Sequence, residues 1–166
     1  MKVKPKSIAF IGICTALAMV FAYVEVLIPP LFPAIPGIKM GLPNIIIIYL
    51  LYKKGAKTAA IVSLLRIILV SILFGNMMAF LYSLAGGALS LGVMILFRKL
   101  KFLSTVGVSV LGAVTHNIGQ IIMAIILLET LELGYYLVVL TVTGTISGIL
   151  IGLCGALLLK RVPLKF

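Results

Sequence analysis

The sequence predicts an all-α integral membrane protein, a single transmembrane domain over residues 1–166 that folds as a bundle of about six helices. Apolar residues make up 63% of the chain, and the mean hydropathy is +1.35. Charged residues make up only 10%, whereas soluble domains carry roughly 25%. Several apolar runs are long enough to cross a bilayer as helices. Together these observations exclude a soluble globular domain.

The net charge of +11 comes mostly from four basic clusters at the ends of apolar runs. The clusters are Lys2, Lys4 and Lys6; Lys53, Lys54 and Lys57; Arg98, Lys99 and Lys101; and Lys160, Arg161 and Lys165. This placement is typical of membrane topology and of attraction to anionic lipid, and it argues against nucleic-acid binding. With all four clusters inside, the chain is expected to be a multi-pass protein of the cell membrane with both termini in the cytoplasm.

Six spans follow from this topology. Their approximate bounds are 7–29, 42–52, 57–73, 78–97, 105–128 and 135–159. The second is short for a full crossing, so it either begins in the preceding loop or crosses a locally thinned part of the bundle. It is nevertheless needed, because without it the Lys53 cluster would lie outside.

The segment 28–44 between the first two spans contains five prolines and two glycines. These residues rule out a regular helix, while the apolar residues between them disfavour open water. Two interpretations remain. The segment is either an outer loop that folds over the bundle as a plug or lid, or an ordinary interfacial loop that rests on lipid headgroups.

Small residues recur at helix-packing spacing in three spans. The sixth has Gly144, Gly148 and Gly152, the fourth has Ser83 with Gly87 and Gly86 with Ser90, and the first has Gly12 with Ala16 and Ala18 with Ala22. Such spacing lets helices approach closely. We expect packing within the molecule for the fourth and sixth spans, whereas the first span could equally face a separate membrane partner.

Arg66 lies near the centre of the third span. An arginine facing lipid there would cost about 2.5–3.5 kcal/mol, so we expect the side chain to face the interior. It is either a structural arginine that binds backbone carbonyls or an anion site, because a guanidinium stays charged and offers a planar fork to carboxylate or phosphate. Tyr82 and Ser83 in the fourth span are further candidates for a cavity wall.

The polar motif at residues 115–120 lies at a similar depth in the fifth span. His116 and Gln120 share a helix face, and Asn117 is adjacent to His116. All three are candidates for ligand contact, with a structural hydrogen-bond network or a proton relay as alternatives. No second histidine or aspartate is present to complete a metal site, so neither a metal nor another cofactor is predicted.

Three more polar residues are candidates on the outer side. Lys39 lies outside the basic clusters, and it could attract an anionic ligand or pair with Glu25. Asn44 and Asn76 lie at outer helix ends, where they could line a site or cap a helix; capping is the preferred interpretation.

No catalytic constellation emerges from the sequence. A nucleophile with a base, a P-loop, paired carboxylates and a CxxC pair are all missing. The sequence therefore indicates a non-catalytic protein, and without a nucleotide-binding motif it would need a separate partner to use ATP.

The order of these features resembles the Gx transporter family, whose members are also labelled heptaprenyl diphosphate synthase component I. The resemblance covers essentially the whole chain. It rests on the basic N-terminus, the Pro-rich loop ending in Gly41-Leu42-Pro43-Asn44, Leu65-Arg66 followed by Leu73-Phe74-Gly75, and Thr115-His116-Asn117-Ile118-Gly119-Gln120. The six-helix layout is similar to the substrate-binding S components of energy-coupling factor (ECF) vitamin transporters.

The ECF resemblance implies a membrane transport subunit that binds a small molecule near its outer face, under the Pro-rich loop. Its first helix would dock onto a shared T component with two ATPases. Arg66 would hold an anionic group, and Lys39 would attract it. His116, Asn117 and Gln120 would orient the ligand. The substrate candidates that the resemblance suggests are an isoprenoid or quinone precursor or a flavin.

The synthase label implies a different function. The usual all-trans prenyl synthases hold magnesium and diphosphate with Asp-rich motifs, and this chain contains no Asp. It would therefore be a non-catalytic accessory subunit that works with a catalytic prenyl synthase. A third hypothesis is a structural membrane adaptor without a ligand.

Overall fold

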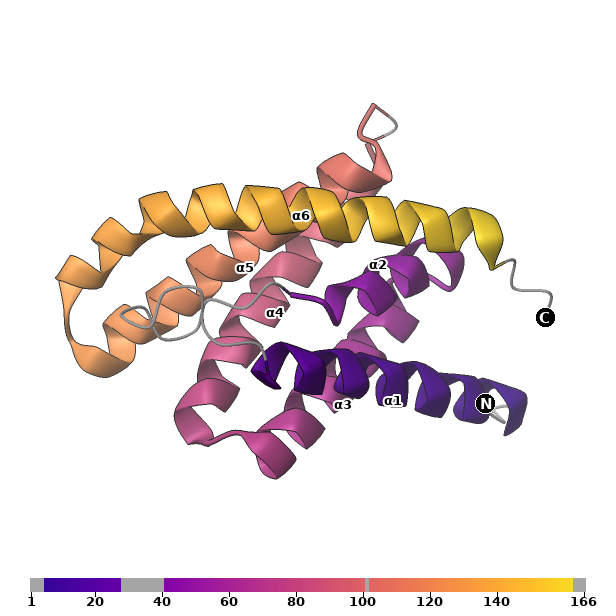
Figure 1. Ribbon diagram of the computed structural model, residues 1–166, viewed down its shortest axis with the longest axis horizontal. Helices are drawn as coiled ribbons and strands as arrows, with labels where there is room; N and C mark the ends of the chain where they lie inside the picture. Colours follow the sequence, from indigo (N-terminus) through magenta and orange to yellow (C-terminus); the bar gives the residue numbers. More distant parts are fainter. Residues whose placement is uncertain (1–4, 28–40, 101, 163–166) are drawn as a thin grey trace.

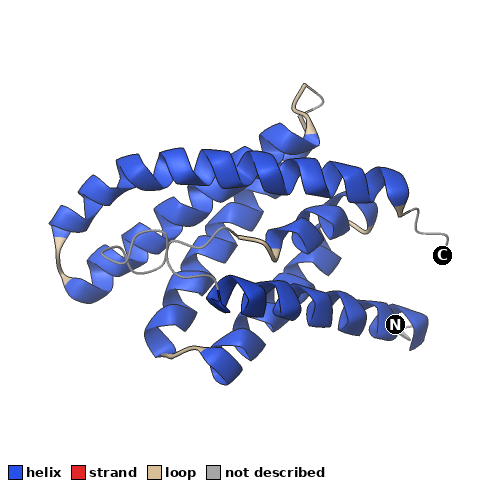
Figure 2. Cartoon of the chain, viewed as in Figure 1, coloured by secondary structure: helices blue, strands red, loops and turns tan. Residues whose placement is uncertain are grey.

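The computed structural model describes residues 5–27, 41–100 and 102–162, and within them the chain is a bundle of α-helices without a strand (Figures 1 and 2). Five of the helices are long and apolar enough to cross a membrane. They are α1 (Pro5–Leu27), α3 (Ala56–Phe74), α4 (Met77–Arg98), α5 (Thr105–Leu128) and α6 (Tyr136–Arg161). A short helix, α2 (Asn44–Lys53), and a 3-10 turn, η1 (Leu131–Tyr135), complete the chain. Each predicted span contains a helix, which confirms the predicted fold class.

The short helix α2 lies inside the bundle. Its ten residues are about 15 Å long, half the thickness of the hydrocarbon core. Gly41, with a φ of 79°, makes the turn that leads into it, a conformation that favours glycine. The side chains of Ile48, Leu50 and Leu51 are completely buried. The predicted second span is therefore a half-helix surrounded by other helices.

Glycines set the close approach of α4, α5 and α6. A Cβ atom on Gly148 would lie 2.7 Å from the Cα of Val110, and one on Gly86 would lie 2.8 Å from the backbone oxygen of His116. Both distances are shorter than real Cβ atoms show, so a larger residue would push the helices apart. The expectation that the fourth and sixth spans pack within the molecule is confirmed.

The small residues of α1 lie on two different faces. Ala18 and Ala22 are buried against the rest of the bundle. Gly12 and Ala16 are exposed, and a Cβ on Gly12 would meet nothing within 4 Å. Part of the stripe thus packs internally, while the other part is open to the surroundings.

Basic residues gather at one end of the bundle. The Nζ of Lys54 lies 5.5 Å from the centre of the Phe10 ring, and the Cζ of Arg98 lies 5.3 Å from the centre of the Tyr52 ring. Figure 1 shows the first turn of α1 and the last turn of α6 at this same end. The ends of helices that carry the basic clusters are therefore close together.

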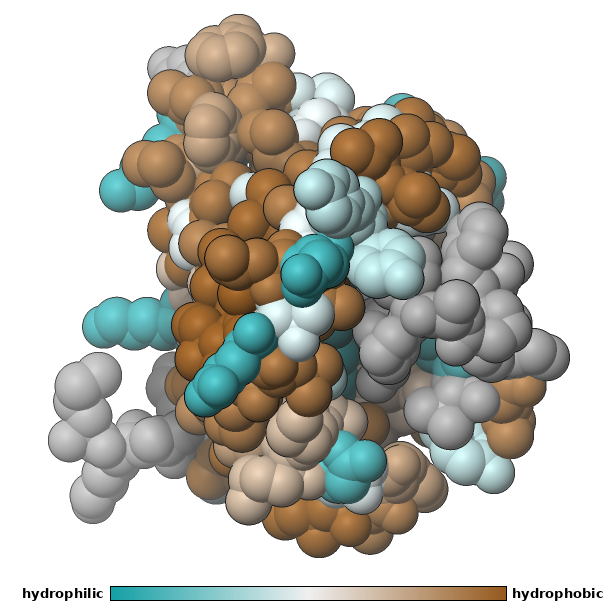
Figure 3. All heavy atoms as spheres, turned by 90° about the vertical axis from the view of Figure 1, so that its left-hand side faces the viewer, coloured by the Kyte–Doolittle hydropathy of each residue, from teal (hydrophilic) through white to brown (hydrophobic). Residues whose placement is uncertain are grey.

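The opposite end carries η1 and faces the viewer in Figure 3, where hydrophobic residues cover most of the described surface. Large apolar side chains are exposed along the helices as well, among them Ile13, Ile72 and Val142. Such side chains are expected on helices that face lipid.

Candidate functional site

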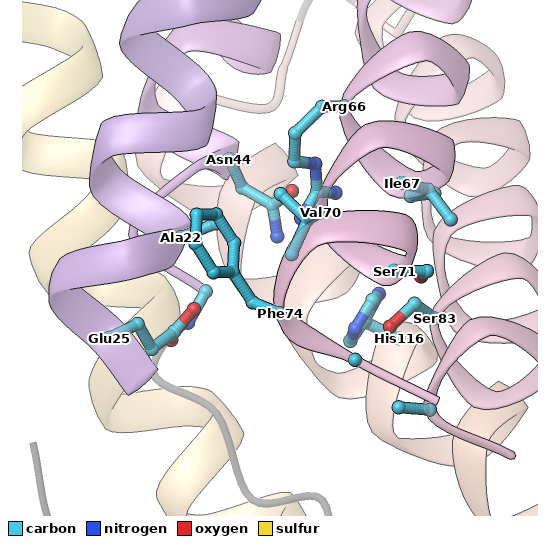
Figure 4. Close-up of a pocket in the computed structure, with 13 residues that line it drawn as sticks. Ala22, Glu25, Asn44, Arg66, Ile67, Val70, Ser71, Phe74, Ser83 and His116 are labelled. Atoms are coloured by element: carbon cyan, nitrogen blue, oxygen red, sulfur yellow. The ribbon is translucent and has the colours of Figure 1, made fainter. Parts of the chain in front are cut away.

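A cavity with a volume of about 80 Å³ lies among α1, α3, α4, α5 and the first residue of α2 (Figure 4). Its polar side chains come from all five of these helices: Glu25, Asn44, Arg66, Ser71, Ser83 and His116. Its apolar wall consists mainly of Ala22, Ile67, Val70 and Phe74. Polar groups that are far apart in the sequence thus converge inside an apolar bundle.

One face of α3 forms much of the wall. Arg66, Val70 and Phe74 are four residues apart, so they project from the same side of the helix into the cavity. Arg66 therefore faces the interior of the bundle, and not lipid. Of the two candidates in the fourth span, Ser83 lines the cavity and Tyr82 does not.

The guanidinium of Arg66 has an unmet donor. Its Nε is buried, and no residue in the described part of the chain accepts a hydrogen bond from it. A buried donor without an acceptor costs about 1–3 kcal/mol. Figure 4 shows Arg66 and Asn44 extending into the same space. A ligand oxygen in this space would supply the missing acceptor.

Glu25 brings a carboxylate to the same cavity. The backbone N–H of Gly41 donates a hydrogen bond to its Oε1, which ties the end of α1 to the turn before α2. Glu25 also interacts electrostatically with Arg66. Sequence reasoning treated Glu25 only as a partner of Lys39. The feature of the sequence that could have identified Glu25 as a cavity residue is the position of an acidic side chain within an apolar span.

The three predicted ligand residues of the fifth span have different surroundings. His116 lines the cavity. Asn117 is buried and donates a hydrogen bond of 2.8 Å from its Nδ2 to the backbone oxygen of Leu140 in α6. Gln120 is buried against α4, where its Cγ would be 2.9 Å from a Cβ on Gly86. The structure thus brings His116 into the cavity with Arg66, but neither Asn117 nor Gln120.

The candidate residues on the outer side also differ in their positions in the structure. The N-cap of α2 is Pro43, whereas Asn44 is the first residue of the helix and lines the cavity, so the capping interpretation is wrong for it. Asn76 does cap its helix, because its Oδ1 accepts a hydrogen bond of 2.8 Å from the N–H of Ala79. Lys39 and the proposed lid or interfacial loop over 28–40 lie outside the described residues.

The chemistry of the cavity suits binding by charge and hydrogen bonds. Within residues 5–27, 41–100 and 102–162, no group of three His, Cys, Asp or Glu side chains could hold a metal ion. The cavity instead offers a guanidinium, a carboxylate, an imidazole, an amide and two hydroxyls beside an apolar wall. Half-helices that end at a polar site within the membrane recur at the substrate sites of transporters.

Comparisons with curated proteins and with solved structures found no match. A protein-family model, in contrast, matches residues 14–158, a range that includes Glu25, Asn44, Arg66 and His116. This match confirms the family label that the sequence motifs suggested. The chain belongs to the family described as heptaprenyl diphosphate synthase component I.

Proposed function

We propose that the chain is a membrane transport subunit, similar to an ECF S component, that binds a small molecule through an anionic group at Arg66. The position of Arg66 carries the proposal. It lies about midway along α3 and lines an internal cavity. Because a guanidinium near the bilayer centre is costly, a ligand that pairs with it accounts for its position.

The arrangement of charge supports uptake from outside. The cavity includes Glu25 near the end of α1 and Gly75 after the end of α3, and both lie away from the helix ends that carry the basic clusters. If the basic end faces the cytoplasm, as the positive-inside pattern indicates, the cavity lies toward the outer face. In this proposal, the ligand comes from outside and Lys39 attracts it.

Energy would come from a separate module. The exposed Gly12 and Ala16 give α1 a face on which another membrane helix could pack closely. In this proposal, that face docks onto a T component with two ATPases. Lipid covers the remaining apolar surface.

Purification from native membranes in mild detergent tests the proposal, with mass spectrometry of the bound proteins and small molecules. Wild type is compared with Arg66→Gln and with Arg98→Gln, a matched loss of one arginine at the basic end. We expect a small molecule to accompany wild type and Arg98→Gln, and to be lost from Arg66→Gln. Equal recovery from all three proteins would remove Arg66 from the binding site.

The family match favours a second candidate, a non-catalytic accessory subunit of heptaprenyl diphosphate synthesis. In this case an Asp-rich catalytic prenyl synthase would accompany the chain in the same purification, and no ATPase would. The length of the prenyl product would also change when the chain is deleted. An unchanged product length would count against this candidate.

A further inference from the structure

A second, smaller cavity lies among α2, α4, α5 and α6. Its volume is about 10 Å³, and a buried water molecule needs about 10–15 Å³. Three polar side chains line it: Asn44 at the start of α2, Ser90 on α4 and Ser109 on α5. Asn44 also lines the first cavity (Figure 4). The asparagine therefore lies at the boundary between the two cavities.

The hydroxyl of Ser90 is buried without a partner. Ser90 is only 2% exposed, and its Oγ has no hydrogen-bond partner in the part of the chain that the structure describes. A hydroxyl on a helix can donate to the backbone oxygen four residues earlier, as Thr15 and Thr115 do over 2.8 and 2.7 Å. The Ser90 Oγ instead faces Gly112, where an added Cβ would lie 3.3 Å from it. Because Gly112 also lines the second cavity, the hydroxyl is directed into this cavity.

We propose that the second cavity is a binding site for one ordered water molecule, which bridges Ser90 and Ser109 to Asn44. A buried water typically makes about three hydrogen bonds to polar groups that otherwise lack partners. Two hydroxyls and an amide can supply them, because each of these groups can both donate and accept. The inference goes beyond the proposed function, since the water site does not depend on a ligand in the first cavity.

The wall of the second cavity favours a neutral occupant. Ile48, Met94 and Ile151 are apolar, and no acidic side chain among the described residues lines the cavity. A metal cation would therefore be buried there without a negative partner, which costs far more than burying a neutral molecule that is hydrogen-bonded. A water molecule fits these surroundings better than a cation does.

The water would join a short helix to two long ones. Asn44 is the first residue of α2, whereas Ser90 and Ser109 belong to α4 and α5. Buried waters that satisfy polar groups in this way are costly to remove. We therefore expect the side chain of Asn44 to keep one orientation at the boundary of the first cavity.

A density map that resolves ordered waters tests the inference on the full-length protein in lipid nanodiscs. The expected peak lies in the second cavity, about 2.5–3.0 Å from the Oγ of Ser90 and within hydrogen-bond distance of both Ser109 and Asn44. The peak should weaken or vanish in Ser90→Ala. No peak in wild type, or a peak that contacts Ser90 alone, would overturn the inference.

The sign of a stability change gives a second test. If a water satisfies the hydroxyl, Ser90→Ala removes a hydrogen bond and lowers Tm; if the hydroxyl has no partner, the same change removes the cost of burying it and raises Tm. The matched control is Ser147→Ala, because the Ser147 hydroxyl donates over 3.2 Å to the backbone oxygen of Gly144 in its own helix. The control also accounts for the higher helix propensity of alanine. We expect Ser90→Ala to lower Tm by more than Ser147→Ala, and an unchanged or raised Tm contradicts the water.

A double-mutant cycle tests whether one water serves both serines. Ser90→Ala combined with Ser109→Ala should lower Tm by less than the sum of the two single losses, whereas Ser90→Ala combined with Ser147→Ala should be additive. Additive losses in the first pair count against a shared water.

The identity of the occupant is tested by comparing Tm in sodium chloride and in choline chloride at the same concentration. We expect equal values, because water is present in both. A higher Tm in sodium that Ser90→Ala abolishes would show a bound cation and would reject the water.

Discussion

Asn117 and His116 are adjacent in the sequence but contact different parts of the structure. His116 lines the cavity, whereas Asn117 is only 6% exposed and joins α5 to the backbone of Leu140 in α6. Successive residues of a helix point about 100° apart, so adjacent residues can face different neighbours. The structure therefore favours the hydrogen-bond network over ligand contact for Asn117.

Replacing Asn117 by alanine should affect stability and not binding. Interhelical hydrogen bonds in membranes contribute about 0.6 kcal/mol on average and up to about 1.7 kcal/mol, and we expect a loss in this range for Asn117→Ala. His116→Ala should instead weaken the binding of the co-purifying ligand. Unfolding in denaturing detergent and ligand affinity are the two measurements. A loss of affinity in Asn117→Ala at wild-type stability would place Asn117 in the site.

The sequence predicted some cavity residues and missed others for physical reasons. Arg66 and His116 were identifiable because polar groups at hydrocarbon depth need partners. Glu25 was not placed with them, because its position depends on how the chain returns from α1 to the turn at Gly41. Asn44 was expected to be a cap, since the sequence does not show that α2 begins inside the bundle.

At the level of helices, the glycines of α6 determine how closely α6 packs on α5. A Cβ on Gly148 would lie 2.7 Å from a backbone atom of Val110, which can move only if the helices separate. A Cβ on Gly12 would meet nothing within 4 Å. These two glycines therefore form a matched pair, one in a tight contact and one in open space.

Gly148→Ala should destabilise the protein by about 1–3 kcal/mol, the usual range for overpacking. Gly12→Ala should leave stability unchanged or raise it slightly, because alanine favours a helix over glycine. The free energies of unfolding of the two variants are measured under the same conditions and compared. Equal stability of both variants would show that α5 and α6 pack less closely than the structure indicates.

The lengths of the helices were largely predictable, but their partners were not. Hydropathy and the positions of the basic clusters placed all six helices, including the short α2. The hydropathy pattern of a transmembrane helix does not show which of its faces is buried, because lipid-facing and buried residues are similar in hydropathy. Consequently the convergence of α1, α3, α4 and α5 on one cavity could not be read from the sequence.

At the scale of the whole molecule, the helix ends that precede or follow the basic clusters define one end of the bundle. The hydroxyl of Tyr49 donates a hydrogen bond of 3.0 Å to the backbone oxygen of Val162, which joins α2 to the end of α6. The contact of Lys54 with Phe10 brings the start of α1 to the same place. The positive-inside rule predicts that this end faces the cytoplasm.

Cysteine labelling in intact cells checks this orientation. In a protein whose Cys14 and Cys154 are replaced by serine, we expect Glu132→Cys to react with a membrane-impermeant maleimide from outside. Lys54→Cys should react only after the membrane is permeabilised. The reverse pattern would invert the topology and place the cavity toward the cytoplasm.

A density map of the protein purified from native membranes with its small molecule tests the central claim most directly. The map should show non-protein density in the cavity, within hydrogen-bond distance of the Arg66 guanidinium. Mass spectrometry of the same sample identifies the molecule. A map in which Arg66 donates only to protein groups, with the small molecule bound elsewhere, would contradict the assignment of this cavity as the ligand site.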